Sequence, residues 1–273
     1  MAKSNLAVRF ATAGVGAPAI LALLYFGKPA WWLAFIAVAV AIGAAELFGM
    51  FCREDRVARA LGVLLCEMAL FGLWWGSRDW RVLLTYLFVA PTLAMCLVLL
   101  RLGDMKTAAL RVAAFVFGPI YLGGGLGALV LLRRDAGADG PSFVVLALML
   151  SWLSDTGAYF AGRFLGKHKL YEAVSPKKTV EGAIGGLGGA VVGALLAHFW
   201  YLRSLPLVDG LVLAVVAGGL GPAGALGESL MKRSVGVKDS GGIVPGHGGI
   251  LDRVDALLVT GSITYLYVLW TRG

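Results

Sequence analysis

The chain has 273 residues, of which 59% are hydrophobic and only 15% are charged, with 24 Lys and Arg against 16 Asp and Glu. Soluble domains carry roughly 45–50% apolar and about 25% charged residues, so this composition excludes a soluble globular enzyme, a disordered chain and a secreted disulfide scaffold. The net charge of +8 needs no nucleic acid to explain it, because membrane proteins collect Lys and Arg in their cytoplasmic loops. The sequence predicts an integral membrane protein.

Nine apolar runs are each long enough to cross a bilayer as a helix, which takes about 20 residues. Lipid cannot hydrogen-bond a free backbone, so the runs predict an all-α fold. We expect about nine transmembrane helices, at about 6–26, 30–50, 57–75, 82–100, 109–132, 142–161, 181–201, 206–227 and 254–270.

The positions of the basic residues predict the orientation. If the N-terminus is cytoplasmic, most of the 24 Lys and Arg fall on that side, in agreement with the positive-inside rule. Every Trp except Trp152 then lies at the outer end of its helix, at the interface that an indole prefers. We therefore expect the two longest polar segments, about 162–180 and 228–253, to face the cytoplasm.

The helix expected at 181–201 carries two stripes of small residues. Such stripes let two helix backbones approach closely, so they predict tight packing of this helix against a neighbour. No internal repeat of the kind found in inverted-repeat transporters is visible in the sequence. The stripes are Gly182, Gly186 and Ala190, and Gly185, Gly189 and Gly193.

The segment 228–255 is the richest in chemistry. Cations suit phosphate oxygens, glycine permits close backbone approach, and clustered carboxylates suit a hard cation such as Mg²⁺. Asp252 and Asp255 share one face if they open the last helix, although the positive end of a helix dipole also favours carboxylates there. The charged members and the histidine are Glu228, Lys232, Arg233, Lys238, Asp239, His247, Asp252, Arg253 and Asp255.

A second basic cluster is the segment 175–181, Ser-Pro-Lys-Lys-Thr-Val-Glu. Lys177 and Lys178 offer point charges to phosphates, and Glu181 is placed to hold one of them. Taken alone, a basic loop at a membrane face is also typical of a topology signal or a lipid-headgroup contact.

Carboxylates within the apolar runs form a third group of candidates. Asp155 lies at helical spacing from Trp152 and Tyr159 near the cytoplasmic end of the sixth run. An ionisable residue at membrane depth is a functional candidate, and the alternative is a structural pair with a nearby Lys or Arg. For Glu46 and Glu67, which lie away from the polar clusters, we favour structural pairing.

Together these motifs resemble those of the phosphatidate cytidylyltransferases, or CDP-diacylglycerol synthases. The resemblance covers about residues 145–260 well and the N-terminal third only by hydropathy. It implies a nine-helix enzyme that faces the cytoplasm, uses Mg²⁺ and is commonly a homodimer. The residues that carry it are Glu46-Leu47, Trp152 to Tyr159, Ser175 to Gly182, Ser229, Lys232-Arg233, Lys238 to Gly241, Pro245 to Gly249 and Asp252 to Asp255.

One position departs from the family pattern. Relatives usually read Gly-Asp-x-x-Glu-Ser before the C-terminal motif, and that Asp is a metal ligand, whereas this chain has Ala225 there. Alanine cannot bind a metal. The departure leaves three readings: a rebuilt metal site, an enzyme of weaker activity, or a non-catalytic paralogue.

The resemblance implies transfer of CMP from CTP to phosphatidic acid at the inner (plasma) membrane, with Mg²⁺ and a possible second, monovalent cation. It divides the chain into an N-terminal scaffold of about five helices, residues 1–135, and a catalytic domain of about four, residues 136–273. The expected catalytic residues are Lys178, Lys238, His247 and Asp252. The expected substrate-binding residues are Ser175, Lys177, Ser229, Lys232, Arg233, Asp239, Ser240 and Arg253, and the expected metal ligands are Asp252, Asp255, Asp155 and Glu228.

Other functions remain open at this point. Another CTP-using membrane lipid enzyme, such as a polyprenol kinase, needs the same phosphate-binding residues. An anion transporter or channel explains a basic inner vestibule, but not the carboxylates clustered beside glycine-flanked basic residues. The expected partners are CTP, phosphatidic acid, membrane lipids and a second copy of the chain, without nucleic acid.

Overall fold

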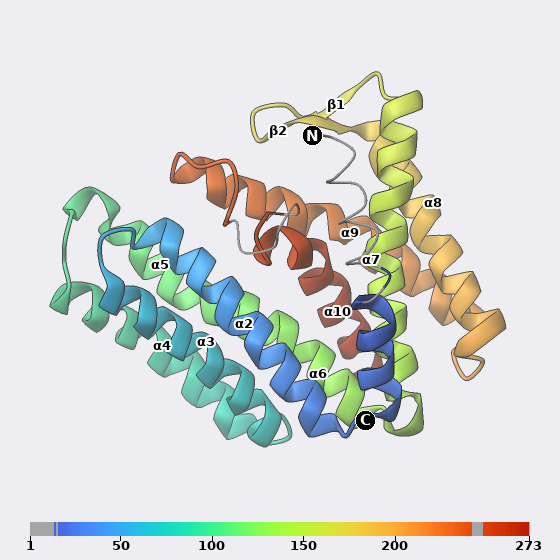
Figure 1. The fold of residues 1–273 in the computed structure, drawn as a ribbon, viewed down its shortest axis with the longest axis horizontal. Helices are drawn as coiled ribbons and strands as arrows, with labels where there is room; N and C mark the ends of the chain where they lie inside the picture. Colours follow the sequence, from blue (N-terminus) through green and yellow to red (C-terminus); the bar gives the residue numbers. More distant parts are fainter. Residues whose placement is uncertain (1–13, 15, 242–247, 273) are drawn as a thin grey trace. The chain divides into compact units, whose positions relative to one another are not determined.

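The structure is a computed structural model that describes residue 14 and residues 16–241 and 248–272 (Figure 1). These residues are helical apart from one small hairpin and short connections, which confirms the all-α membrane fold. Of the nine predicted spans, the first, at about 6–26, lies only partly within the described residues. Its described part contains a shorter apolar helix, Gly16–Phe26. The other eight are confirmed as helices long and apolar enough to cross a membrane, at Pro29–Phe51, Arg56–Gly76, Trp80–Leu100, Met105–Asp135, Gly137–Phe164, Val180–Tyr201, Leu207–Ser234 and Leu251–Arg272.

The chain forms two compact units, and each is described by itself. Unit 1 contains the described residues up to Val130 together with those of Asp239–Asp252. Unit 2 contains Leu131–Lys238 and the described residues from Arg253 onward. The loop before the last helix thus belongs to unit 1. The division at residue 135 into a scaffold and a catalytic domain stays a prediction.

Unit 1 is a bundle of helices packed around large side chains of α2. The ring of Phe48 lies against Gly62, where a Cβ would overlap it, and its centroid is 5.0 Å from that of Phe115. At the other end of α2, Trp32 Nε1 donates to the carbonyl oxygen of Leu129 at 3.1 Å. The elements are α2 (Pro29–Phe51), α3 (Arg56–Gly76), α4 (Trp80–Leu100), the 3₁₀ turn Met105–Thr107, α5 (Ala108–Gly118), the π-helical turn Pro119–Gly124 and the first part of α6 (Gly125–Asp135).

One carboxylate joins the helix ends of unit 1 at the side where α2 ends and α3 begins. Asp55 caps α3 by accepting from the backbone N–H groups of Val57 and Ala58, which satisfies donors that the helix itself cannot pair. Its other oxygen accepts from Arg101 Nε at 2.6 Å. This hydrogen bond from the guanidinium holds the pKa of Asp55 at about 2, below its ordinary value.

Unit 2 is organised by the close contact of α7 and α8. A Cβ on Gly189 would overlap the carbonyl oxygen of Leu153, and one on Gly157 would overlap that of Gly185. The small-residue stripes therefore allow the close helix packing that the sequence predicts. The elements are the rest of α6, the 3₁₀ turn Gly137–Asp139, α7 (Gly140–Phe164), β1 (Lys169–Tyr171), β2 (Ser175–Thr179), α8 (Val180–Leu196), the π-helical turn Ala197–Tyr201, α9 (Leu207–Ser234) and α10 (Leu251–Arg272), which enters this unit at Arg253.

The α7–α8 contact can be tested with two adjacent glycines. Gly189→Ala is expected to lower the free energy of unfolding by about 1–3 kcal/mol, because overpacking a close contact forces the backbones apart. Gly188→Ala is the matched control, since a Cβ there meets nothing within 4 Å and alanine favours the helix. Thermal unfolding of both variants in detergent measures the difference. Equal midpoints would show that Gly189 is not a packing contact.

The helix α9 is longer than the sequence predicts. Hydropathy ends this span near residue 227, but the helix continues to Ser234. The extension is supported by Glu228 and Lys232, which lie one turn apart and are both buried, with Lys232 Nζ 3.2 Å from Glu228 Oε2. An ion pair at this spacing stabilises a helix, and a hydropathy window does not detect it. The polar connection before α10 is correspondingly shorter than the predicted 228–253.

Candidate active site

The predicted basic loop at 175–181 begins as a β-strand. β2 pairs antiparallel with β1, with Lys169 opposite Thr179 and Tyr171 opposite Ser175. The hairpin is tied further by Lys169 Nζ, which donates to the carbonyl oxygen of Pro176 at 2.6 Å. Along β2, Lys177 is exposed and Lys178 is half-buried. Ser175 is also half-buried.

Glu181 fixes the hairpin to the start of α8. Its carboxylate accepts from the backbone N–H groups of Lys167 and His168, and it lies 2.6 Å from His168 Nδ1. The side chain thus binds the segment before β1, in place of the expected contact with Lys177 or Lys178.

Charged residues on three helices of unit 2 act on Lys178. Its ammonium interacts electrostatically with Asp255 of α10, Asp155 of α7, and Glu228 and Lys232 of α9. Burial lowers the pKa of Lys178 from its ordinary value, and the three carboxylates act in the opposite direction. The structure therefore brings together five residues that the sequence analysis placed in the site.

Asp155 and Asp255 are two of the predicted metal ligands, and both belong to unit 2. They come from α7 and α10, and each acts electrostatically on the other, with Lys178 and Arg253 as nearby positive charges. Across the described parts of the chain, no three His, Cys, Asp or Glu side chains form a group that could hold a metal alone. Mg²⁺ bound with a nucleotide takes one or two carboxylates plus substrate phosphates, and this pair matches that donor set.

The residues predicted on α9 share one stripe of that helix. Ala225, Glu228, Ser229 and Lys232 follow at helical spacing, so they lie on one face. Glu228 and Lys232 are buried, while Ala225 and Ser229 are half-buried. Because Glu228 is paired with Lys232, its role as a metal ligand stays a prediction.

Arg233, Lys238, Asp239 and Arg253 lie at the surface of the described structure. All four side chains are exposed, and Arg233 Nη1 donates to the carbonyl oxygen of Val237 at 3.3 Å. Their predicted roles in substrate binding and catalysis are not tested by this geometry. His247, predicted to act on the leaving group, lies outside the described residues.

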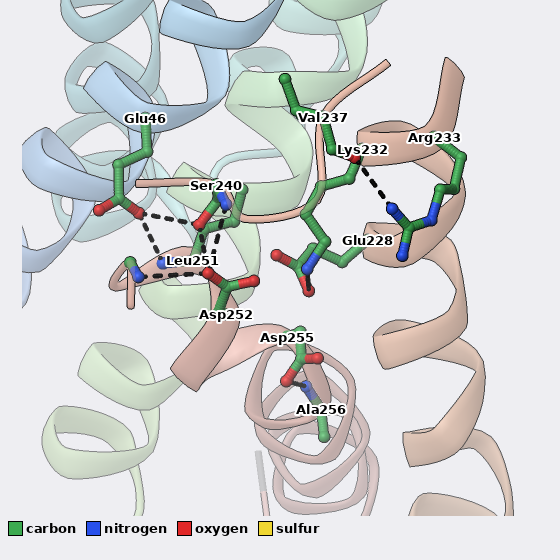
Figure 2. A network of polar contacts seen from close by, with 11 residues as sticks. Glu46, Glu228, Lys232, Arg233, Val237, Ser240, Leu251, Asp252, Asp255 and Ala256 are labelled. Carbon is green, nitrogen blue, oxygen red and sulfur yellow. Dashed lines mark hydrogen bonds and ion pairs between the residues drawn. The ribbon is translucent and has the colours of Figure 1, made fainter. Parts of the chain in front are cut away.

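Asp252 and Ser240 form a separate polar cluster in unit 1, and it includes a residue that the sequence analysis did not place in the site. Asp252 Oδ2 accepts from Ser240 Oγ at 2.8 Å and Ser240 N at 3.3 Å (Figure 2). It also accepts from Gly249 N at 3.2 Å. Glu46 of α2 reaches the same cluster through Ser240 Oγ, at 3.4 Å. The structure thus shows Asp252 as an anchor of the loop, and its predicted role as a metal ligand stays a prediction.

Comparison with known proteins identifies the family to which the chain belongs. The model of the cytidylyltransferase family matches residues 7–271, nearly the whole chain. The chain belongs to this family. The resemblance inferred from the motifs is therefore confirmed.

Several relatives of this cytidylyltransferase family member are phosphatidate cytidylyltransferases of bacteria. The enzyme of Staphylococcus saprophyticus is 33% identical over 231 residues, which is 83% of each chain. That of Staphylococcus haemolyticus is 45% identical over 121 residues, 44% of this chain and 46% of the relative. That of Synechocystis sp. is 44% identical over 126 residues, 45% of this chain and 42% of the relative.

Proposed function

We propose that this chain transfers CMP from CTP to phosphatidic acid, giving CDP-diacylglycerol and pyrophosphate. The observation that carries the proposal is the group of charges around Lys178 in a chain that matches the family from residue 7 to residue 271. A transporter or channel needs positive charge along a path, but not two carboxylates beside a half-buried lysine. Among enzymes, a phosphoryl or nucleotidyl transferase uses that combination.

The chemistry of the reaction explains which groups the site needs. A phosphate monoester has a second pKa near 6, so the lipid phosphate is already an anion at pH 7 and needs no strong base. One of its oxygens attacks the α-phosphorus of CTP, the new P–O bond forms, and the bond to the β-phosphate breaks as pyrophosphate leaves. Two anions must approach each other in line. Catalysis therefore depends on positioning and on neutralising charge.

Each part of unit 2 supplies one of these requirements. Asp155 and Asp255 would hold Mg²⁺, which, when bound, screens the phosphate charges and orients them. Lys178 places a positive charge beside the two carboxylates, where partial burial strengthens its interaction with a phosphate. Exposed Lys177 is available to attract the CTP phosphates, as are Arg233 and Arg253. Glu228 holds Lys232 in a buried ion pair.

The departure at Ala225 is compatible with an active site. Ala225 is half-buried on α9, one turn before Glu228, and a missing carboxylate at this position leaves the pair Asp155 and Asp255 in place. We therefore propose an active enzyme that lacks this ligand, in preference to a non-catalytic paralogue. The homodimer and the second, monovalent cation implied by the resemblance stay predictions.

The orientation that suits the reaction places the hairpin and the α9–α10 loop in the cytoplasm. The chain is a multi-pass membrane protein, and we propose that it lies in the inner (plasma) membrane with its N-terminus and active site on the cytoplasmic side. CTP then reaches the site from the cytosol, while the acyl chains of the lipid stay in the bilayer. The basic residues of the hairpin support this orientation through the positive-inside rule.

Cysteine labelling tests the orientation directly. In a variant without Cys52, Cys66 and Cys96, a cysteine at the exposed position Glu172, in the hairpin turn, is expected to be protected from an impermeant thiol reagent in intact cells. A cysteine at the exposed position Arg203, between α8 and α9, is expected to react. Permeabilised cells, in which both should react, are the control. The reverse pattern would overturn the proposed topology.

The activity itself is tested by incubating purified protein with labelled CTP, phosphatidic acid and Mg²⁺. A lipid that carries CMP and an equal amount of pyrophosphate are the expected products. Omission of phosphatidic acid should abolish both. Pyrophosphate release without a labelled lipid would contradict the proposal, because the nucleophile would then be water.

A further inference from the structure

Glu46 of α2 is a buried carboxylate bound to a loop that lies about two hundred positions later in the chain. Only 6% of its surface is exposed. One of its oxygens accepts from the backbone N–H group of Ile250 at 3.1 Å. The other accepts from that of Leu251 at 2.9 Å (Figure 2). Both N–H groups stand at the start of α10, where the first donors of a helix have no partner within it.

The start of α10 depends on this distant side chain. Ile250, directly before the helix, has no side-chain oxygen that could cap it, and Glu46 supplies the acceptors instead. A carboxylate also suits the positive end of the helix dipole. Glu46 therefore fixes the place where α10 begins, and with it the first turn that carries Asp252.

Two glycines of the loop lie so close to the Glu46 carboxylate that neither position has room for a Cβ. A Cβ on Gly241 would lie 2.6 Å from Glu46 Oε1, and its nearest atoms are all in the Glu46 side chain. A Cβ on Gly249 would overlap Ser240 Oγ and lie 2.5 Å from Glu46 Oε2. The side chain thus contacts the loop near both of its ends, on the two sides of residues 242–247.

Ser240 connects Glu46 to Asp252. Its hydroxyl has one proton, and the shorter contact, 2.8 Å to Asp252 Oδ2 against 3.4 Å to Glu46 Oε2, assigns that proton to Asp252. With the N–H groups of Ser240 and Gly249 also directed at Oδ2, one oxygen of Asp252 is occupied and the orientation of its carboxylate is determined by the loop.

We propose that Glu46 is a positioning residue for the transfer reaction, which acts by holding the loop ends and the first turn of α10 so that Asp252 keeps a single orientation. This inference rests on the proposed function and on the predicted role of Asp252 in it, since it assigns Glu46 to that reaction. Residues that orient the groups of a site commonly change activity by about 10–100-fold when they are replaced. A residue needed only for folding would instead change stability and leave the kinetics of the folded fraction alone.

Kinetics of Glu46→Gln test the role. Gln keeps the shape but replaces one acceptor oxygen by a donor, so one N–H of α10 loses its partner. We expect kcat for CMP transfer to fall about 10–100-fold, with little change in the KM for CTP. Glu67→Gln is the matched control, a half-buried carboxylate of α3 in the same unit, and it is expected to keep the wild-type kcat. An unchanged kcat in Glu46→Gln would overturn the proposal.

Gly241→Ala gives a second test that does not depend on the folding of a Glu46 variant. The three atoms nearest to the added methyl all belong to Glu46, so this substitution should displace the carboxylate and lower kcat in the wild-type background. In a Glu46→Ala background the methyl has room, and Gly241→Ala should lower kcat no further. Such non-additivity is the signature of direct contact. Additive effects on kcat would contradict the arrangement.

Hydrogen exchange separates this inference from the proposed function. In Glu46→Gln, amide exchange should accelerate in peptides that contain Ile250 and Leu251 and stay unchanged in α3, whatever the enzyme's activity. Faster exchange with an unchanged kcat would refute positioning while leaving the contact intact. Unchanged exchange would refute the contact itself. A wild-type protein that transfers no CMP would instead refute the proposed function, which the exchange data alone do not test.

Discussion

Asp255→Asn is expected to lower kcat for CMP transfer by at least about 100-fold, because it removes one of the two carboxylates that would hold Mg²⁺ without changing the volume of the side chain. A metal ion contributes several kcal/mol to such a reaction, and each 1.36 kcal/mol is a factor of ten in rate. Asp155→Asn should have an effect of the same order. The double variant should be little worse than either single variant, since the two residues would act on one ion.

The measurement is a Mg²⁺ titration of activity, accompanied by thermal unfolding. A ligand that binds only the folded state raises its stability, so Mg²⁺ with CTP should raise the unfolding midpoint of the wild type and not that of Asp255→Asn. Asp209→Asn is the control in the same unit. It removes the charge of a carboxylate that accepts from the Tyr267 hydroxyl at 2.6 Å, which weakens this hydrogen bond, and is expected to change stability, not kcat. Wild-type turnover of Asp255→Asn at saturating Mg²⁺ would contradict the assignment.

Lys178→Met is expected to lower kcat by about 10²–10³-fold, the usual loss on removing a preorganised group that stabilises charge in the transition state. Lys177→Met is the matched control, because the neighbouring lysine of the same strand is exposed. An exposed, solvated charge contributes mainly to attraction of the nucleotide, so Lys177→Met should raise the KM for CTP and change kcat much less. Equal effects of the two variants on kcat would show that the partial burial of Lys178 is unimportant for the reaction.

The pH dependence gives an independent check on Lys178. Burial lowers its pKa, so the side chain loses its proton, and the enzyme its activity, at a lower pH than an ordinary lysine would. The alkaline limb of the kcat profile should therefore move to higher pH in Lys178→Arg, since arginine stays charged over that range. Lys177→Arg should leave the limb where it is. If the alkaline limb of Lys178→Arg matches that of the wild type, the limb reflects the titration of another group.

The helices of this protein follow from its sequence because the bilayer imposes one simple requirement on each span, a sufficient length of apolar residues. Eight of the nine predicted spans coincide with helices of the described structure. The glycine pattern of α8 likewise predicts its close contact with α7, since only small residues allow such an approach. Helix ends are harder to predict from hydropathy. The helix α9 continues past its apolar region, where Glu228 and Lys232 form a buried ion pair.

The site was predictable to the extent that its residues are charged and lie in polar segments. Lys178, Asp155 and Asp255 were all singled out, and the structure brings their charges together. Glu46 was noted in the sequence but interpreted as a structural pair outside the site, because its partners are the backbone N–H groups of residues more than two hundred positions away. Every residue other than proline has a backbone N–H group, so the sequence does not show which of these groups will bind a distant carboxylate. The available signal was a carboxylate at membrane depth together with glycines at both ends of the loop, Gly241 and Gly249.

The position of the label in the product tests the central claim most directly. Purified protein in vesicles that contain phosphatidic acid is incubated with Mg²⁺ and with CTP labelled at either the α- or the γ-phosphate. We predict that the α-label appears in the lipid, in an amount equal to the pyrophosphate released, and that the γ-label appears only in pyrophosphate. Transfer of the γ-label to a lipid would identify a kinase, and the absence of any labelled lipid would contradict cytidylyl transfer altogether.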